Sequence, residues 1–461
     1  MSLQAAYLNA LIYTMNKLVN ELGTEKISKL LIKQAVPASI GILVMSLNMI
    51  IDTILVGQWI GIMAMAAITV VLPIAFLIAS IGMGIGIGGS SIISRALGAN
   101  TINKAFTTFG NQIMLTIVLS MVFVGIGIYF CFPVLQLFGA HGDIVIPATE
   151  YFHVILYGVP FFAFAMMGNP VLRAIGKAKI AMYAMIISAT INVLLDIICI
   201  KFLDLGMFGA GLATAVSYVA SGVFILGFFV SSKSTLRISI AHFIPNSQII
   251  TEIISLGGIT IVRQGAISLL LIILNYTLFK YGGEIAIAVY GIINRVMMFA
   301  LFPVLGVTQG FLPIAGFNYG SNDYKRVKES IRTAIMFGTG IALFIFMVVV
   351  LFPSNIVEVF TKNCELLAKT PNALLIAFLA TPFITAQFIG SAYFQAIGKA
   401  LPALVLTLLK QGVFLIPLVY FLPKYLGITG VWVSFPIADV LATSITMLYL
   451  RRELNKPQPI Q

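Results

Sequence analysis

Three carboxylic side chains fall in the middle of long apolar stretches of the chain. They are Asp52, Asp196 and Asp439, out of fifteen acidic residues. An ionised carboxylate at the centre of a bilayer costs about 2.5 to 3.5 kcal/mol on insertion scales. Each group must therefore be protonated, paired with a cation or bound to an ion. The chemistry that such groups offer is the uptake and release of cations.

Two of these carboxylates share a spacing with an amide. Asn48 precedes Asp52 by four residues, and Asn192 precedes Asp196 by four. On a helix, this spacing places amide and carboxylate on one face. Two carboxylates that lie close together in a medium of low dielectric titrate as a coupled unit and can share a proton. The alternative is that each aspartate only hydrogen-bonds a neighbouring helix.

The same oxygens also suit a dehydrated Na⁺, a hard cation that prefers oxygen ligands. The hydroxyl of Thr214 and the backbone carbonyls of the Gly209-Ala210-Gly211 run would add ligands to the two carboxylates. The residue types fit H⁺ and Na⁺ equally well, so the sequence predicts a cation site and leaves the ion open.

The second half of the chain carries a different set of embedded ionisable residues. They are Arg263, Arg295, Lys410 and Asp439. A buried ion pair costs less in lipid than a lone charge, so we favour Asp439 as the partner of one of these cations over a role as an ion relay. Neutral polar residues either line a cavity or bridge helices there; they are Gln264, Asn275, Asn294 and Gln309.

The composition requires lipid as the solvent for most of the chain. Of 461 residues, 60% are hydrophobic and 9% charged, with a mean hydropathy of +1.06. A water-soluble protein has about a quarter of its residues charged. With roughly 20 residues for each spanning helix, the apolar runs predict an all-α membrane protein with twelve spans. These lie at 35–57, 63–89, 107–130, 146–169, 178–201, 208–230, 255–279, 285–311, 331–352, 371–394, 401–421 and 428–450.

The chain resembles itself at a shift of 222 residues. Gly84 then falls on Gly306, and the run Ala174–Lys177 falls on Ala396–Lys399. The repeat predicts two six-helix lobes related by a pseudo-two-fold axis along the membrane normal, which is an architecture for alternating access. The expected parts are an amphipathic lead-in at 1–34, an N-lobe at 35–232, a linker at 233–250, a C-lobe at 251–451 and a tail at 452–461.

Charge and motifs narrow the location and the class of function. Most of the 27 Lys and Arg fall in segments on the side of both termini, which places both termini in the cytoplasm of a multi-pass cell-membrane protein. This topology also explains the net charge of +12 without a nucleic-acid partner. The chain has no P-loop, and its three histidines and three cysteines show no metal-ligand spacing. We therefore expect no enzyme activity, no cofactor, and a monomer with a small-molecule substrate.

Pro37 stands fifteen residues before Asp52 in the first predicted span. Because proline removes one backbone hydrogen bond and permits a bend, a bend there would displace the carboxylate.

The chain resembles the MATE family, the multidrug and toxic compound extrusion transporters, over essentially its whole length. The residues that carry the resemblance are Pro37, Asp52 and Val56-Gly57, then Asn192, Asp196 and the run Gly209–Thr214, and finally the run Gln309–Gly320. The resemblance implies efflux of substrates, often organic cations, in exchange for H⁺ or Na⁺.

The resemblance also implies particular site residues. In DinF-like and MepA-like members the cation site lies in the first lobe. Its residues correspond here to Asp52, Asn192, Asp196, Thr214 and the backbone carbonyl of Ala210, with Tyr151 and Asn169 at positions of the supporting hydrogen-bond network. NorM-like members carry an acidic residue in the seventh helix, where this chain has Arg263-Gln264. We therefore expect no acidic cation site in the second lobe.

These observations predict a cation-coupled antiporter that exports drug-like solutes. One alternative is a flippase for lipid-linked sugars, which would need a cavity rich in cations for the pyrophosphate. A second alternative is a non-transporting receptor or scaffold, which would need a larger output surface than the linker and tail supply.

Overall fold

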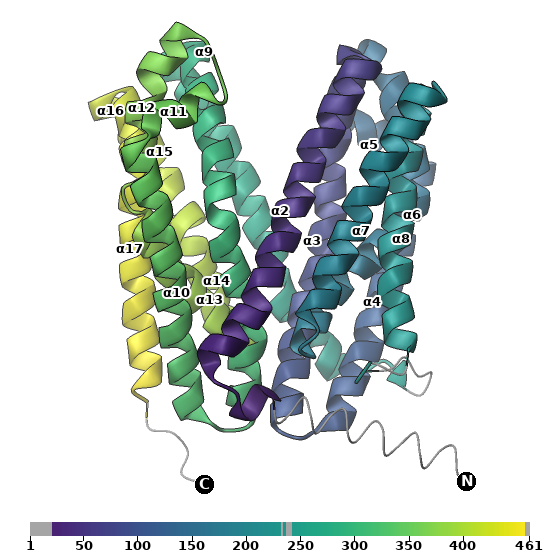
Figure 1. The fold of residues 1–461 in the computed structure, drawn as a ribbon, viewed down its shortest axis with the longest axis vertical. Helices are drawn as coiled ribbons and strands as arrows, with labels where there is room; N and C mark the ends of the chain where they lie inside the picture. The colour runs from purple at the N-terminus through teal and green to yellow at the C-terminus, as the bar shows by residue number, and fades with distance from the viewer. Residues whose placement is uncertain (1–20, 232–233, 237–241, 457–461) are drawn as a thin grey trace. The chain divides into compact units, whose positions relative to one another are not determined.

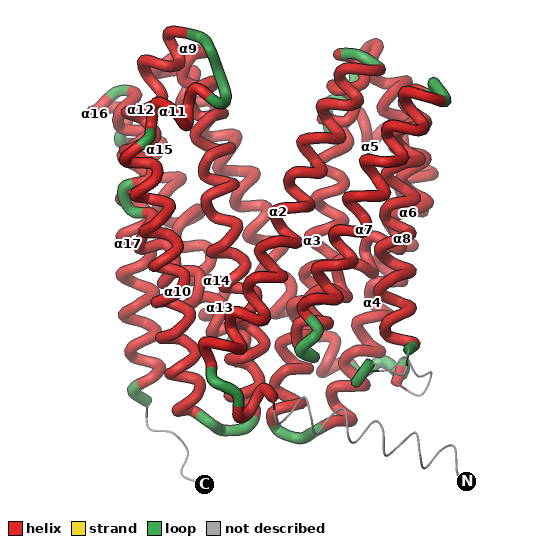
Figure 2. Tube along the Cα trace, in the orientation of Figure 1, coloured by secondary structure: helices red, strands yellow, loops and turns green. Residues whose placement is uncertain are grey.

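The structure is a computed structural model that describes residues 21–231, 234–236 and 242–456. Within these ranges the chain is helical and contains no β-strand (Figures 1 and 2). Residues 1–20 of the predicted lead-in, 233 and 237–241 of the linker, and 457–461 of the tail lie outside the described residues.

The described residues of the first half form six long helices and three short elements. They are α2 (Ile27–Trp59), α3 (Ile62–Gly98), α4 (Ile102–Tyr129), α5 (Cys131–Leu137), the 3₁₀ turn η1 (Gly142–Ile144), α6 (Val145–Ala174), α7 (Ala178–Asp196), the π-helix η2 (Ile197–Phe202) and α8 (Gly206–Val230).

The second half begins with a helix of 74 residues and is more broken toward its end. Its elements are α9 (Ser247–Gly320), α10 (Tyr324–Leu351), α11 (Pro353–Glu358), α12 (Cys364–Phe378), α13 (Thr381–Ala396), α14 (Ala400–Leu408), the π-helix η4 (Leu409–Leu415), α15 (Ile416–Phe421), α16 (Pro423–Leu426) and α17 (Ile428–Leu454).

The described residues contain the twelve predicted spans. Ten helices are long and apolar enough to cross a membrane, and α12 with α13, bent by 45° at their break, forms an eleventh span. The long helix α9 leaves helical geometry at Gly283, with φ 64° and ψ −160°, and each side of this break exceeds the roughly 20 residues of a span. Counting α9 as two spans gives twelve. Most helices are longer than the predicted spans, because polar residues at their ends continue the helix beyond the apolar run.

The chain packs into two compact units that exchange segments of their first helices. Apart from short segments, the first unit consists of Ile40–Ile261 with Gly316–Asn322, and the second contains Lys26–Ser39, Val262–Ala315 and the chain from Asp323 onward. The 222-residue repeat carries Lys26–Ser39 onto 248–261, which belongs to the first unit. In each half, the first helix therefore begins in one unit and continues in the other.

Glycines permit close backbone contacts at these exchanged segments. In the first unit, a Cβ on Gly84 would lie 2.9 Å from the carbonyl oxygen of Gly257. In the second unit, a Cβ on Gly310, a glycine of the second half, would lie 2.8 Å from the backbone nitrogen of Ala35. Each half of the repeat thus packs its second helix, through glycines, against the start of the other half's first helix.

We expect Gly88→Ala to destabilise the protein, because the added Cβ would collide with the backbone carbonyl of Ile253. Overpacking of this kind typically costs about 1–3 kcal/mol. The measurement is thermal unfolding of the purified protein. Gly125→Ala is the matched control, since its Cβ would meet nothing within 4 Å and alanine favours helix. Equal melting temperatures for the two variants would contradict the close packing.

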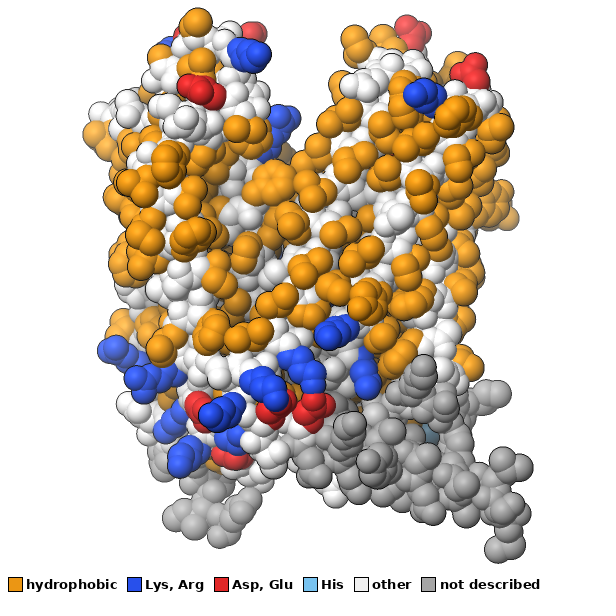
Figure 3. All heavy atoms as spheres, in the orientation of Figure 1, with side chains coloured by type: hydrophobic (Ala, Val, Ile, Leu, Met, Phe, Trp, Pro, Cys, Tyr) orange, Lys and Arg blue, Asp and Glu red, His pale blue; other side chains and the backbone are white. Residues whose placement is uncertain are grey.

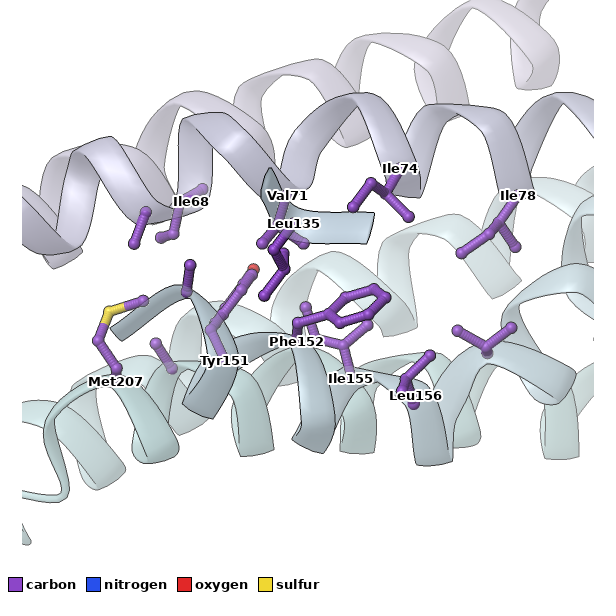
Figure 4. Packing of buried hydrophobic residues seen from close by; sticks show 14 of the residues in the cluster. Ile68, Val71, Ile74, Ile78, Leu135, Tyr151, Phe152, Ile155, Leu156 and Met207 are labelled. Atoms are coloured by element: carbon purple, nitrogen blue, oxygen red, sulfur yellow. The ribbon is translucent and has the colours of Figure 1, made fainter. Parts of the chain in front are cut away.

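The core of the first unit holds the helices that carry the candidate site. Side chains of α3 lie opposite side chains of α6 in this core (Figure 4). Those from α3 are Ile68, Val71, Ile74 and Ile78, and those from α6 are Tyr151, Phe152, Ile155 and Leu156. Their spacing of three or four residues matches one face of each helix, so Tyr151 is held by packing on the same face as the apolar core residues.

Candidate functional site

The two carboxyl groups of the first half face each other. Asp52 lies on α2 and Asp196 is the last residue of α7, and their side chains lie within hydrogen-bonding reach of one another. Asp52 is 9% exposed and Asp196 is 0% exposed. The two aspartates, each four residues after an asparagine, thus form one buried acidic pair to which two helices contribute.

The acidic pair lacks other donors. Among the described residues, no group outside the pair donates a hydrogen bond to Asp52 Oδ1 or to either carboxyl oxygen of Asp196. Two carboxylates in contact cannot both stay ionised unless something positive lies between them. A shared proton or a small cation coordinated by oxygen satisfies this requirement, so the residues present fit either ion.

A network of neutral polar side chains adjoins the pair, one helical turn earlier on α2 and α7. Asn48 Nδ2 donates to Asn192 Oδ1 at 2.9 Å, and Asn192 Nδ2 donates to Thr214 Oγ1 at 3.4 Å. The hydroxyls of Tyr151 and Thr214 lie 3.3 Å apart. The network connects α2, α7, α8 and α6 by hydrogen bonds beside the turns that carry the acidic pair.

The positions one turn after each aspartate are apolar and buried. Val56 follows Asp52 by one turn and is 0% exposed, and Ile200 follows Asp196 by one turn and is 3% exposed. Both belong to the core of the first unit. The positions one turn after the two carboxyls are therefore packed in the apolar core, whereas the positions one turn before them carry the amides of Asn48 and Asn192.

Ala210 lies on α8, one turn before Thr214, and is fully buried. Its neighbour Gly211 allows α8 to approach α6 closely, because a Cβ there would lie 3.1 Å from the carbonyl oxygen of Tyr151. The close approach of these helices keeps Ala210 and Thr214 beside Tyr151.

Asn169 lies away from this network, although it shares α6 with Tyr151. The two residues are eighteen positions apart, which is about 27 Å along a helix. Asn169 Nδ2 donates to the carbonyl oxygen of Ala165 at 3.4 Å, and its Oδ1 accepts from Arg173 at 3.3 Å.

Pro37, the predicted bend in the first span, lies inside α2. The helix continues through this proline, and this part of α2 belongs to the second unit.

Tyr218 is a residue that the sequence reasoning missed. It stands one turn after Thr214 on α8, and its hydroxyl interacts electrostatically with Asp52. Its ring stacks on Phe162 with ring centroids 4.0 Å apart. The signal was present as a four-residue spacing from Thr214, the same spacing that relates each asparagine to its aspartate.

In the second unit, Asp439 on α17 forms an ion pair with Lys410 in η4, with Nζ and Oδ1 2.5 Å apart. The two side chains are 2% and 11% exposed. The repeat places Ser217 and Ser188 at these positions in the first half, so the pair is a feature of the second half alone. Within the described part of the chain, no carboxylate lies within 4.0 Å of Arg263 or Arg295.

The remaining polar residues expected near a second-lobe cavity differ in exposure. Gln264 and Gln309 are half-buried and Asn275 is exposed. Over the described ranges there is no cluster of three or more His, Cys, Asp or Glu side chains that would hold a metal ion. The cysteines Cys131, Cys199 and Cys364 are free.

The family model described as MatE matches residues 37–198 and again residues 260–421. The two matches begin 223 residues apart, within one residue of the 222-residue shift of the internal repeat. The multidrug export protein MepA of Staphylococcus aureus (strain MRSA252) is 28% identical over 422 residues, which are 91% of this chain and 93% of that protein.

Two solved structures are similar over almost the whole chain, at 27% sequence identity. The crystal structure of MATE in the bent conformation has a TM-score of 0.90 and covers 95% of this chain and 97% of that one. The outward-facing conformation of a multidrug resistance MATE family transporter of the MOP superfamily has a TM-score of 0.89, with the same coverages of 95% and 97%.

Proposed function

Because this chain belongs to the MatE family, we propose that it is an antiporter that exports drug-like solutes, organic cations or amphipathic molecules, in exchange for H⁺ or Na⁺. The observation that carries the proposal is the pair of facing carboxyl groups of Asp52 and Asp196, buried and without outside donors among the described residues. The similarity to the multidrug export protein MepA supports the substrate class.

The coupling follows from linkage. An ion can expel a solute only if it binds better to the state that releases the solute, and the solute then weakens ion binding by the same factor. When a cation occupies the acidic pair, Asp52 and Asp196 no longer repel each other. Asn48 on α2 bonds Asn192 on α7, so this change alters how α2 packs on α7. The packing of α2 on α7 therefore differs between the two states of the transporter.

The ion and its ligands are also part of the proposal. For H⁺, the two carboxyls share the proton and the amides of Asn48 and Asn192 orient the network. For Na⁺, the carboxyl oxygens, Thr214 Oγ1 and the carbonyl of Ala210 supply hard oxygen ligands. Either ion would interact with the carboxyl oxygens of Asp196, which accept no hydrogen bond from described residues outside the pair.

We place the protein in the cell membrane as a monomer with both termini in the cytoplasm. The support for this orientation is the excess of Lys and Arg in the segments on that side. A lipid-linked sugar flippase is less well supported, because Lys410 is engaged by Asp439. Among the cations predicted within the second-half spans, only Arg263 and Arg295 then remain for a pyrophosphate.

The test is efflux from reconstituted vesicles driven separately by a pH gradient and by a Na⁺ gradient, with cationic, neutral and anionic dyes. We expect one gradient to drive export of cationic or amphipathic dyes and to be dissipated as they move. If neither gradient drives any dye, or if anionic dyes alone are exported, the proposal fails.

A further inference from the structure

Three cations lie on one exposed face at the start of α10. Lys325, Lys328 and Arg332 are spaced by three and four residues, so they share one side of the helix. All three are exposed. Within the described part of the chain, none has a carboxylate within 4.0 Å, and Glu329 beside them in the sequence forms no ion pair with them.

Helix stability does not explain these charges. The N-terminus of a helix carries a partial positive charge, so cations in the first turns are unfavourable there. The repeat-related positions in α4 are Asn103, Phe106 and Gly110, none of them charged. The cations are therefore particular to α10, and with no carboxylate beside them among the described residues they present three positive charges to an external anion.

An apolar groove continues along the same face of α10. Met336, Phe337, Gly340, Ile341 and Phe344 line a shallow groove of about 480 Å³. Met336 is 62% exposed and Phe344 is 63% exposed. A Cβ on Gly340 would meet nothing within 4 Å, so the missing side chain leaves open space beside the helix.

The charged and apolar parts form one continuous surface. Arg332 and Gly340 are eight residues apart, about 12 Å along the helix axis. Figure 3 shows Lys and Arg side chains, with Asp and Glu side chains among them, at the end where α10 begins, and hydrophobic side chains farther along the helices. A ligand that fits this surface has an anionic head and an apolar chain.

We propose that this face of α10 is a binding site for an anionic phospholipid, with its phosphate against Lys325, Lys328 and Arg332 and an acyl chain in the groove at Gly340. The charge of the cluster selects an anionic lipid over a zwitterionic one, because each basic side chain near the surface adds to the attraction. The site is independent of ion-coupled export and does not involve the acidic pair.

The test is titration of the delipidated protein with phosphatidylglycerol and with phosphatidylcholine, with bound lipid counted by native mass spectrometry. We expect the wild type to prefer phosphatidylglycerol, and the triple variant K325Q/K328Q/R332Q to lose at least about tenfold in affinity for it. The control K104Q/R451Q/R452Q removes the same charge from exposed cations elsewhere, and it should bind as the wild type does.

The groove is tested without a change of charge. Gly340→Leu fills the open space and should also weaken phosphatidylglycerol binding, whereas Gly125→Leu on α4, equally free of neighbours, should not. Equal loss in the two charge-removal variants would mean attraction by net charge alone, and it would overturn the site. Unchanged binding in K325Q/K328Q/R332Q, or equal affinity of the wild type for both lipids, would overturn it as well.

Discussion

Asp52→Asn and Asp196→Asn are each expected to reduce ion-driven efflux to the level of passive leak. An amide has no charge for a cation to neutralise, so the pair would no longer distinguish an occupied from an empty state. Asparagine is close to aspartate in size, and the site is buried at 9% and 0% exposure, so the helices should pack as before. The measurement is the initial rate of dye export from vesicles under an imposed H⁺ or Na⁺ gradient.

The control for this pair of variants is Asp143→Asn, which changes an exposed carboxylate before α6. We expect it to transport as the wild type does. Gel-filtration profiles and reconstitution yields of all three variants show whether each protein is folded and inserted. Full gradient-driven export by both Asp52→Asn and Asp196→Asn would refute the role of the acidic pair.

Breaking the ion pair of the second unit is expected to have the largest effect on stability. Lys410→Met leaves Asp439, 2% exposed, without its partner at 2.5 Å. Removing one member of a buried pair typically costs about 3–5 kcal/mol, because the remaining charge stays buried and uncompensated. The measurement is the free energy of unfolding of the purified protein in a denaturant series.

The double variant Lys410→Met with Asp439→Leu separates pairing from packing. Replacing both charges with apolar groups is often neutral or stabilising, and the first half carries uncharged serines, Ser188 and Ser217, at the same repeat positions. We expect the double variant to regain most of the stability lost by Lys410→Met. If the double variant instead loses as much stability as Lys410→Met and Asp439→Leu lose together, the two residues contribute nothing as a pair.

The sequence predicted the number of spans and the acidic pair, for identifiable reasons. Lipid requires long apolar runs, so the spans could be counted from those runs in the sequence. The four-residue spacing of Asn48 to Asp52 and of Asn192 to Asp196 fixed a shared face on each helix. The span count depends on the length of apolar runs and the shared faces depend on helical periodicity, and a single sequence contains both.

The neighbours of a side chain on other helices were harder to predict from the sequence. The family resemblance gave Asn169 as a matching residue type, but it lies about five turns from Tyr151 on α6. Tyr218 was missed because a tyrosine in an apolar helix is ordinary until its neighbours are known. Which face of α8 meets Asp52 is decided by tertiary packing.

Local irregularities of the helices also escaped prediction. The π-helices at Ile197–Phe202 and Leu409–Leu415, and the break at Gly283, do not change the apolar character of their spans. Hydropathy reports the solvent of a segment and not its hydrogen-bond register. Both π-helices nevertheless adjoin buried ionisable residues: η2 follows Asp196 directly, and η4 contains Lys410.

The exchange of a bound cation at Asp52 and Asp196 is tested most directly by counting the ions that leave when a substrate binds. Purified protein in a weakly buffered solution receives a cationic dye, while a pH indicator reports protons and ²²Na⁺ loaded beforehand reports sodium. We predict release of about one H⁺ or one Na⁺ for each dye bound, and none from the protein carrying both asparagine substitutions. Equal ion release from the wild type and that doubly substituted protein would contradict the account.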